Sequence, residues 1–143
     1  MNTGLISLRY AKALLDFAIA SNQQDEVYTK FKILSEVFLQ VPELRNTMSD
    51  FTLLKESKKR VIITACGGDV PLSLDKMIDL ILKNDREETL QYIALKFIDL
   101  YRDKYNILYG RLITAFPFSK ENEEIFISRI KKIVKENVEI DPI

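Results

Sequence analysis

The sequence predicts a mainly α-helical protein, in which a six-helix amino-terminal bundle is followed by a partial α/β segment of strand, helix and strand. Over residues 5–105, apolar side chains recur at intervals of three and four and are interrupted by turn-forming residues. After Asn106 the run ILYGRLITAF is rich in β-branched and aromatic residues and is too short for another long helix. A chain of 143 residues can hold one compact domain and part of a second.

Turn and capping residues divide the first part of the chain into six expected helices. Pro42 ends the second helix and suits the first turn of the third. The fourth stops at Gly67 and Gly68, a pair typical of helix ends. Ser73 is expected to cap the fifth helix, and Asp85 marks the turn before the sixth. The expected helices cover residues 5–20, 27–41, 42–48, 55–66, 74–84 and 86–105.

The last part of the chain follows a different pattern. The run after Asn106 predicts a strand over residues 107–116 that Pro117 closes, and Ser119 is placed to cap a seventh helix. VEI at residues 138–140 predicts a second short strand. Strand, helix and strand cannot enclose a core, so we expect residues 106–143 to be an incomplete second domain. The residues expected to face inward from the seventh helix are Ile125, Phe126, Ile130, Ile133 and Val134.

Composition argues against several classes of function. Lysine and arginine number 21, as do aspartate and glutamate, so no overall field attracts nucleic acid or an anionic membrane. Histidine is absent, which removes the commonest general base and metal ligand, and we expect no catalytic residue, metal or cofactor. Cys66 lies in the apolar run VIITAC and is expected to be a buried, inert thiol in a reducing compartment. No run reaches the roughly 20 apolar residues that cross a bilayer, and we expect no secretory signal.

The first helix has more apolar surface than a surface helix needs. Arg9, Lys12 and Asp16 share one narrow polar stripe, with apolar flanks on both sides of it. Either the helix is central in its own bundle, or one flank docks a partner. The fifth helix is similarly broad, because Leu80 widens the face formed by its other apolar residues. The first flank contains Ile6, Tyr10, Ala13, Leu14 and Phe17, and the second contains Leu8, Ala11, Leu15, Ala18 and Ile19.

Four segments, taken in order, resemble the ATP synthase delta subunit family, whose mitochondrial counterpart is the oligomycin sensitivity-conferring protein. They are RYAKALLDFA at 9–18, LILKNDREETL at 80–90, FIDLYRDKYNI at 97–107 and LITAFPFS at 112–119. Together they extend over nearly the whole chain. The family continues for a few dozen residues more, so the sequence looks truncated, and the family has glycine where this chain has Asp85.

The resemblance implies a non-catalytic subunit of the peripheral stalk of a proton- or sodium-translocating ATP synthase. Residues 1–105 would bind the amino-terminal helix of an alpha subunit, and residues 106–143 would hold the carboxy terminus of the stalk b subunit. Such a subunit has no membrane span of its own and lies at the cytoplasmic face of the bacterial inner membrane. The family's groove for the alpha helix, between the first and fifth helices, carries over by position to Tyr10, Ala13, Leu14, Phe17, Met77, Leu80 and Ile81. On this assignment Leu8, Ala11, Leu15 and Ala18 form the bundle core.

Two other classes of function would rely on charged residues of the chain. The basic run KESKKR at 55–60 could present cations to phosphates in an all-helical RNA-binding or antitermination-type module, although such runs are usually solvated helix faces. An enzyme would have to rely on carboxylates, because the chain has no histidine and no Gly-rich phosphate loop. The clustered acids are expected to favour helix starts without a catalytic role, and they are Glu87, Glu88, Glu121, Glu123 and Glu124.

Overall fold

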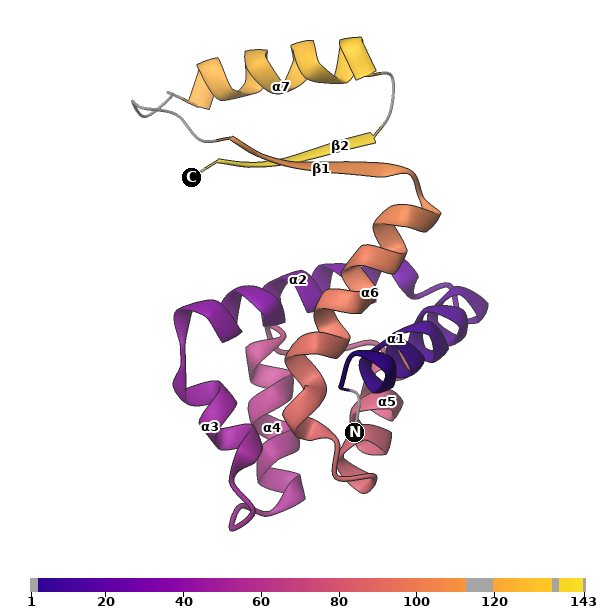
Figure 1. The fold of residues 1–143 in the computed structure, drawn as a ribbon, viewed down its shortest axis with the longest axis vertical. Coiled ribbons are helices and arrows are strands. Elements are labelled where there is room, and N and C mark those ends of the chain that lie inside the picture. The colour runs from indigo at the N-terminus through magenta and orange to yellow at the C-terminus, as the bar shows by residue number, and fades with distance from the viewer. Residues whose placement is uncertain (1–2, 113–119, 135–136, 143) are drawn as a thin grey trace. The chain divides into compact units, whose positions relative to one another are not determined.

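A computed structural model describes residues 3–112, 120–134 and 137–142, and the mainly helical class is confirmed (Figure 1). The first six helices are α1 (Thr3–Ala20), α2 (Gln24–Gln40), α3 (Glu43–Ser49), α4 (Lys55–Ala65), α5 (Leu72–Lys83) and α6 (Leu90–Lys104), with a short 3₁₀ helix, η1 (Glu87–Thr89), before α6. Strand β1 (Ile107–Leu112), helix α7 (Lys120–Val134) and strand β2 (Asn137–Pro142) follow. The chain divides into two compact units, Met1–Tyr101 and Arg102–Ile143.

The core of the first unit is built from one apolar face of each helix. The Phe31 and Phe97 rings meet edge to face, with their centroids 5.2 Å apart, and join α2 to α6. Tyr28 stacks on Tyr101, with centroids 3.9 Å apart, and the Tyr101 hydroxyl donates a hydrogen bond to Asp25. Such aromatic pairs add to the free energy of burial because their rings interlock at defined angles. Other fully buried side chains include Leu14, Leu34, Met48, Ile62, Leu74, Ile78, Ile81, Leu90 and Ile93.

Left-handed backbone at the helix ends explains several of the expected turns. Gly67 and Gly68, with φ of 96° and 103°, end α4, as the sequence predicts. Asp85 has φ of 56°, so an aspartate here adopts the conformation for which glycine is usual. The backbone N–H of Arg86 then reaches back to the carbonyl of Ile81 across 2.9 Å and closes the end of α5.

The start of α5 differs from the prediction. Pro71, not Ser73, occupies the N-cap position, and no side chain caps the helix. Ser73 instead lies within the first turn, where it is buried and its backbone N–H donates to the Gln23 side chain across 2.9 Å. Pro71 suits this place because a helix start leaves its first N–H groups without helical partners, and proline has none to lose.

The second unit contains a parallel pair of strands, with Ile107 opposite Asn137 and Leu112 opposite Pro142. Helix α7 packs against β2 (Figure 1). Arg102, at the beginning of this unit, lies over the Tyr109 ring, with its guanidinium carbon 3.9 Å from the centroid, and forms an ion pair with Glu139 across 3.3 Å. These contacts join Arg102 to both strands of the pair.

Within this second unit, two expectations are revised and others lie outside the described residues. Ile125 is 53% exposed and Phe126 is also exposed, so they do not face inward, because two strands offer α7 little surface to cover. Strand β1 is described as far as Leu112, and the expected roles of Pro117 and Ser119 fall on residues 113–119, which are not described. The burial of Ile133 and Val134 is not described either, whereas Ile130 is half-buried.

Candidate protein-binding site

Helices α1 and α5 lie side by side in the first unit (Figure 1). Asn84, just after α5, donates through Nδ2 to the Tyr10 hydroxyl of α1 across 2.9 Å. At the other end, Gln23, just after α1, accepts the backbone N–H of Ser73 in the first turn of α5. These two bonds join the early part of each helix to the end of the other, so α1 and α5 run antiparallel. We use the name α1–α5 groove for the exposed residues of these two contacting helices, after the groove that the family resemblance implies between the first and fifth helices.

Four of the seven residues expected at this groove are accessible. Ala13 is exposed, Phe17 and Leu80 are each 42% exposed, and Tyr10 is half-buried. Leu80 lies one helical turn before Asn84, and Ala13 lies about one turn after Tyr10, so the antiparallel arrangement brings them to the same level. The accessible residues are therefore two aromatic side chains and a small residue on α1 and one aliphatic side chain on α5.

For the other three residues, the expected exposure is wrong. Leu14 and Ile81 have no exposed surface and Met77 is 8% exposed, because all three point into the bundle. Leu14 shares a face with Ser7, Ala11 and Ala18, which are also fully buried, whereas the expected core residue Leu8 is half-buried. The buried face of α1 is thus rotated toward Leu14 relative to the expectation, and Leu14, Met77 and Ile81 belong to the core of the bundle.

The basic run at the start of α4 is engaged with acids of the same chain. Lys55 Nζ lies 2.7 Å from Asp85 and donates to the carbonyl of Leu82, which lowers the pKa of Asp85 by hydrogen bonding and charge attraction. Lys59 lies 2.8 Å from Asp79 and 3.1 Å from Asp75, and these hydrogen bonds raise the pKa of its ammonium. The run holds α4 against α5, which weakens the nucleic-acid interpretation.

Sequence reasoning missed a buried ion pair within the same run. Lys58 was expected on a solvated face, but its side chain is 3% exposed and its Nζ lies 2.9 Å from Oε1 of Glu87, itself 7% exposed. Lys58 also donates to the carbonyl of Met48 across 3.2 Å. Glu87 was expected only to interact favourably with the dipole at the start of a helix, but it is the counter-ion of the buried Lys58. The signal available in the sequence was weak: Lys58 lies four residues before Ile62, on the buried face of α4.

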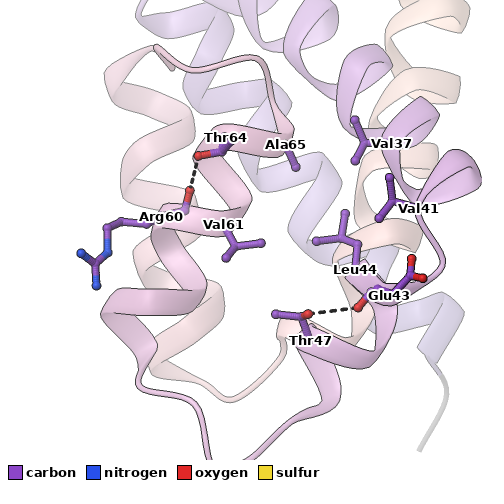
Figure 2. Close-up of a pocket in the computed structure, with 9 residues that line it drawn as sticks. All are labelled: Val37, Val41, Glu43, Leu44, Thr47, Arg60, Val61, Thr64 and Ala65. Carbon is purple, nitrogen blue, oxygen red and sulfur yellow. Dashed lines mark hydrogen bonds between the residues drawn. The ribbon is translucent and has the colours of Figure 1, made fainter.

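A pocket of about 480 Å³ opens between α2, α3 and α4 (Figure 2). Val61 of α4 and Leu44 of α3 point into it, and Thr47 and Thr64 each bond a backbone carbonyl of their own helix, at Glu43 and Arg60. The sequence reasoning did not identify this pocket, because its valines at positions 37 and 41 follow the ordinary core spacing of α2.

The described ranges hold one cysteine, Cys66. Cys66 is fully buried, and desolvation raises the pKa of its thiol to about 12, so it is an inert core residue, as expected. No group of three or more aspartate, glutamate or cysteine side chains that could hold a metal ion occurs among residues 3–112, 120–134 and 137–142. In those same ranges, no helix has the length and apolar character to span a membrane.

Comparisons with known proteins agree with one another. The family model for the ATP synthase delta (OSCP) subunit matches residues 6–143. The ATP synthase subunit delta of Phocaeicola vulgatus is 38% identical over 95% of this chain and 72% of its own length, and that of Bacteroides thetaiotaomicron is 36% identical over the whole chain and 78% of its own length. A chain in the cryo-EM structure of the Toxoplasma gondii mitochondrial ATP synthase hexamer has the same fold, with a TM-score of 0.70 and 18% identity over 96% of this chain and 78% of that chain.

Proposed function

Because the chain belongs to the ATP synthase delta (OSCP) subunit family, we propose that its α1–α5 groove binds the amino-terminal helix of an alpha subunit of the catalytic head. The chain is a non-catalytic stator subunit of the peripheral stalk. A stator prevents the catalytic head from turning with the rotor, so that the torque of ion flow is used for ATP synthesis. Its task requires a long-lived complex with slow dissociation.

The exposure of Ala13, Phe17 and Leu80 on two adjacent helices is the observation that supports this proposal. An amphipathic helix laid in a groove is anchored by apolar side chains at intervals of three and four. Phe17 and Leu80 supply contact area, and Ala13 is small enough to let the partner backbone approach. Tyr10 is held in place by Asn84 and completes the aromatic wall of the groove.

We assign the second unit to the stalk side of the complex. In this assignment, residues 106–143 bind the carboxy terminus of the b subunit. The assembly lies at the cytoplasmic face of the bacterial inner membrane. Exposed apolar residues of this unit, including Leu108, Tyr109 and Ile125, provide surface for such a contact. The alternative RNA-binding function has less support, because Lys55, Lys58 and Lys59 all pair with acids of the bundle.

Titration of the 143-residue chain with a synthetic peptide of the alpha-subunit amino terminus tests the groove. Ala13→Trp should leave the helical circular dichroism spectrum unchanged and reduce affinity by at least about 100-fold, because the indole holds the partner backbone away. Leu95→Trp, at a 43% exposed position on α6, is the matched control and should bind normally. Equal binding by both variants would place the alpha helix elsewhere on the bundle.

A further inference from the structure

The pocket between α2, α3 and α4 shares no residue with the α1–α5 groove (Figure 2). Its volume of about 480 Å³ is within the range of pockets that hold small organic molecules. Most of its wall is apolar, and the apolar residues that line it are Val37, Val41, Leu44, Val61 and Ala65. A pocket of this size and lining favours a ligand with an apolar body, because burying apolar surface is the main source of affinity there.

The uncharged polar side chains of the pocket can accept hydrogen bonds but have no hydrogen left to donate. Thr47 and Thr64 both line it, and each hydroxyl donates to the backbone carbonyl four residues earlier, across 3.0 and 2.8 Å. Because a hydroxyl carries one hydrogen, each threonine oxygen keeps only its acceptor capacity. The backbone N–H groups of Val41 and Leu44 are likewise bonded to carbonyls, across 2.8 and 3.1 Å. A ligand that hydrogen-bonds to these threonines must therefore supply the donor.

The two charged residues that line the pocket have opposite signs. Glu43 belongs to α3 and Arg60 to α4, so their charges offset each other. The Arg60 side chain extends away from Val61, and its guanidinium donates to the Ser57 hydroxyl across 3.4 Å (Figure 2). The exposed Glu43 carboxylate adds further acceptor oxygens. Burying a charge against the apolar wall would be costly, so this lining favours an uncharged ligand that carries a donor.

We propose that this pocket binds a small uncharged molecule that combines an apolar ring system with an O–H or N–H donor. The ring packs against the valines and Leu44, and the donor bonds to a threonine oxygen. A single neutral hydrogen bond of this kind changes affinity by about threefold to tenfold. Such a ligand touches three helices at once and binds the folded bundle in preference to the unfolded chain, so it also raises the thermal unfolding midpoint.

Indole and 1-methylindole are a matched pair of probes for the full chain. They share one ring system, but methylation of the nitrogen removes the donor. In NMR titrations, indole should shift the amide signals of the lining residues and bind about threefold to tenfold more tightly than 1-methylindole. Saturating indole should also raise the thermal unfolding midpoint. Equal affinity for the two probes would overturn the assigned ligand class, and the absence of shifts at the lining residues would overturn the site itself.

Variants of the lining assign the effect to named atoms. Thr47→Val/Thr64→Val keeps the side-chain shape, removes both oxygens and should bind the two probes with equal affinity. Thr29→Val is the matched control, because Thr29 is exposed on α2, makes the same kind of bond to the Asp25 carbonyl across 3.1 Å and lies outside the lining.

This control should keep the preference for indole. Val61→Trp fills the pocket from a 38% exposed position and should lose both probes while its circular dichroism spectrum stays unchanged. A preference for indole that survives removal of both threonine oxygens, or normal binding by Val61→Trp, would show that the probes bind elsewhere and that the proposal is wrong.

Discussion

Lys58 and Glu87 form a buried ion pair, with Nζ and Oε1 2.9 Å apart and both side chains less than a tenth exposed. The same ammonium donates to the Met48 carbonyl in the last turn of α3. One side chain therefore links α3, α4 and η1, three elements separated along the chain. Glu87 Oε2 is buried without a hydrogen-bond partner, so the pair is not fully satisfied. Buried pairs of this kind are costly to break and can often be replaced by apolar residues.

Replacing one partner of this pair should destabilise the protein strongly. Lys58→Met leaves the Glu87 carboxylate buried without its counter-ion, and we expect a loss of about 3–5 kcal/mol in the free energy of unfolding. The double variant Lys58→Met/Glu87→Leu removes both charges and should recover most of that loss. Urea unfolding followed by circular dichroism measures all three proteins. A single variant within about 1 kcal/mol of wild type would show that the pair is unimportant.

The sequence predicted the helices well because their apolar spacing and breakers are local signals. The positive φ of Gly67 follows from residue type in the same way, whereas Asp85 was predicted only as a turn residue. It did not predict Lys58 and Glu87, because they lie 29 positions apart and no local pattern pairs them. It also misplaced Leu14, since α1 is apolar over most of its circumference and small differences in packing decide which flank is buried. The fold class could therefore be predicted from the sequence. Which residues of α1 are exposed could not, because that depends on how α1 is rotated in the bundle.

The corrected burial of α1 has a direct consequence for stability. Leu14→Ala removes a side chain with no exposed surface and should cost about 2–5 kcal/mol through lost burial and a residual cavity. Phe17→Ala removes a side chain that is 42% exposed and should cost less than about 1.5 kcal/mol. Parallel urea unfolding of the two variants makes the comparison. Equal losses would mean that Phe17 is as deeply packed as Leu14.

For affinity, the order of the two positions should be reversed: a change at Phe17 should matter more than a conservative change at Leu14. Phe17→Ala should weaken binding of the alpha-subunit peptide by about tenfold or more under conditions where the bundle is fully folded, because it removes an anchor from the groove. A conservative change at the buried position, Leu14→Met, keeps the core volume and should leave affinity almost unchanged. Calorimetric titration of both variants tests this. Stronger loss of binding with Leu14→Met than with Phe17→Ala would contradict the assignment of the exposed wall.

Cys66 should be unreactive while the protein is folded. Burial raises the pKa of its thiol to about 12, so almost no thiolate exists near neutral pH, and solvent does not reach the sulfur. Iodoacetamide at about pH 8 should leave the native chain unmodified over hours and alkylate it rapidly in urea. Intact-mass spectrometry reports the fraction modified. Rapid native alkylation would require α4 to open at Cys66 far more often than the rest of the core.

The contact between Lys55 and Asp85 should make stability depend on pH in the acid range. The hydrogen bond from Lys55 lowers the pKa of Asp85 below the ordinary value of 3.8, so the folded state binds this proton less readily than the unfolded state. The stabilisation is complete above about pH 4 and disappears as the pH falls through the lowered pKa. Asp85→Asn keeps a residue suited to φ of 56° and removes the charge. We expect the wild type to be modestly more stable than this variant at pH 7, with the difference shrinking toward pH 2 in thermal unfolding. A difference that stays constant over this range would assign the effect of Asp85 to the turn and not to its charge.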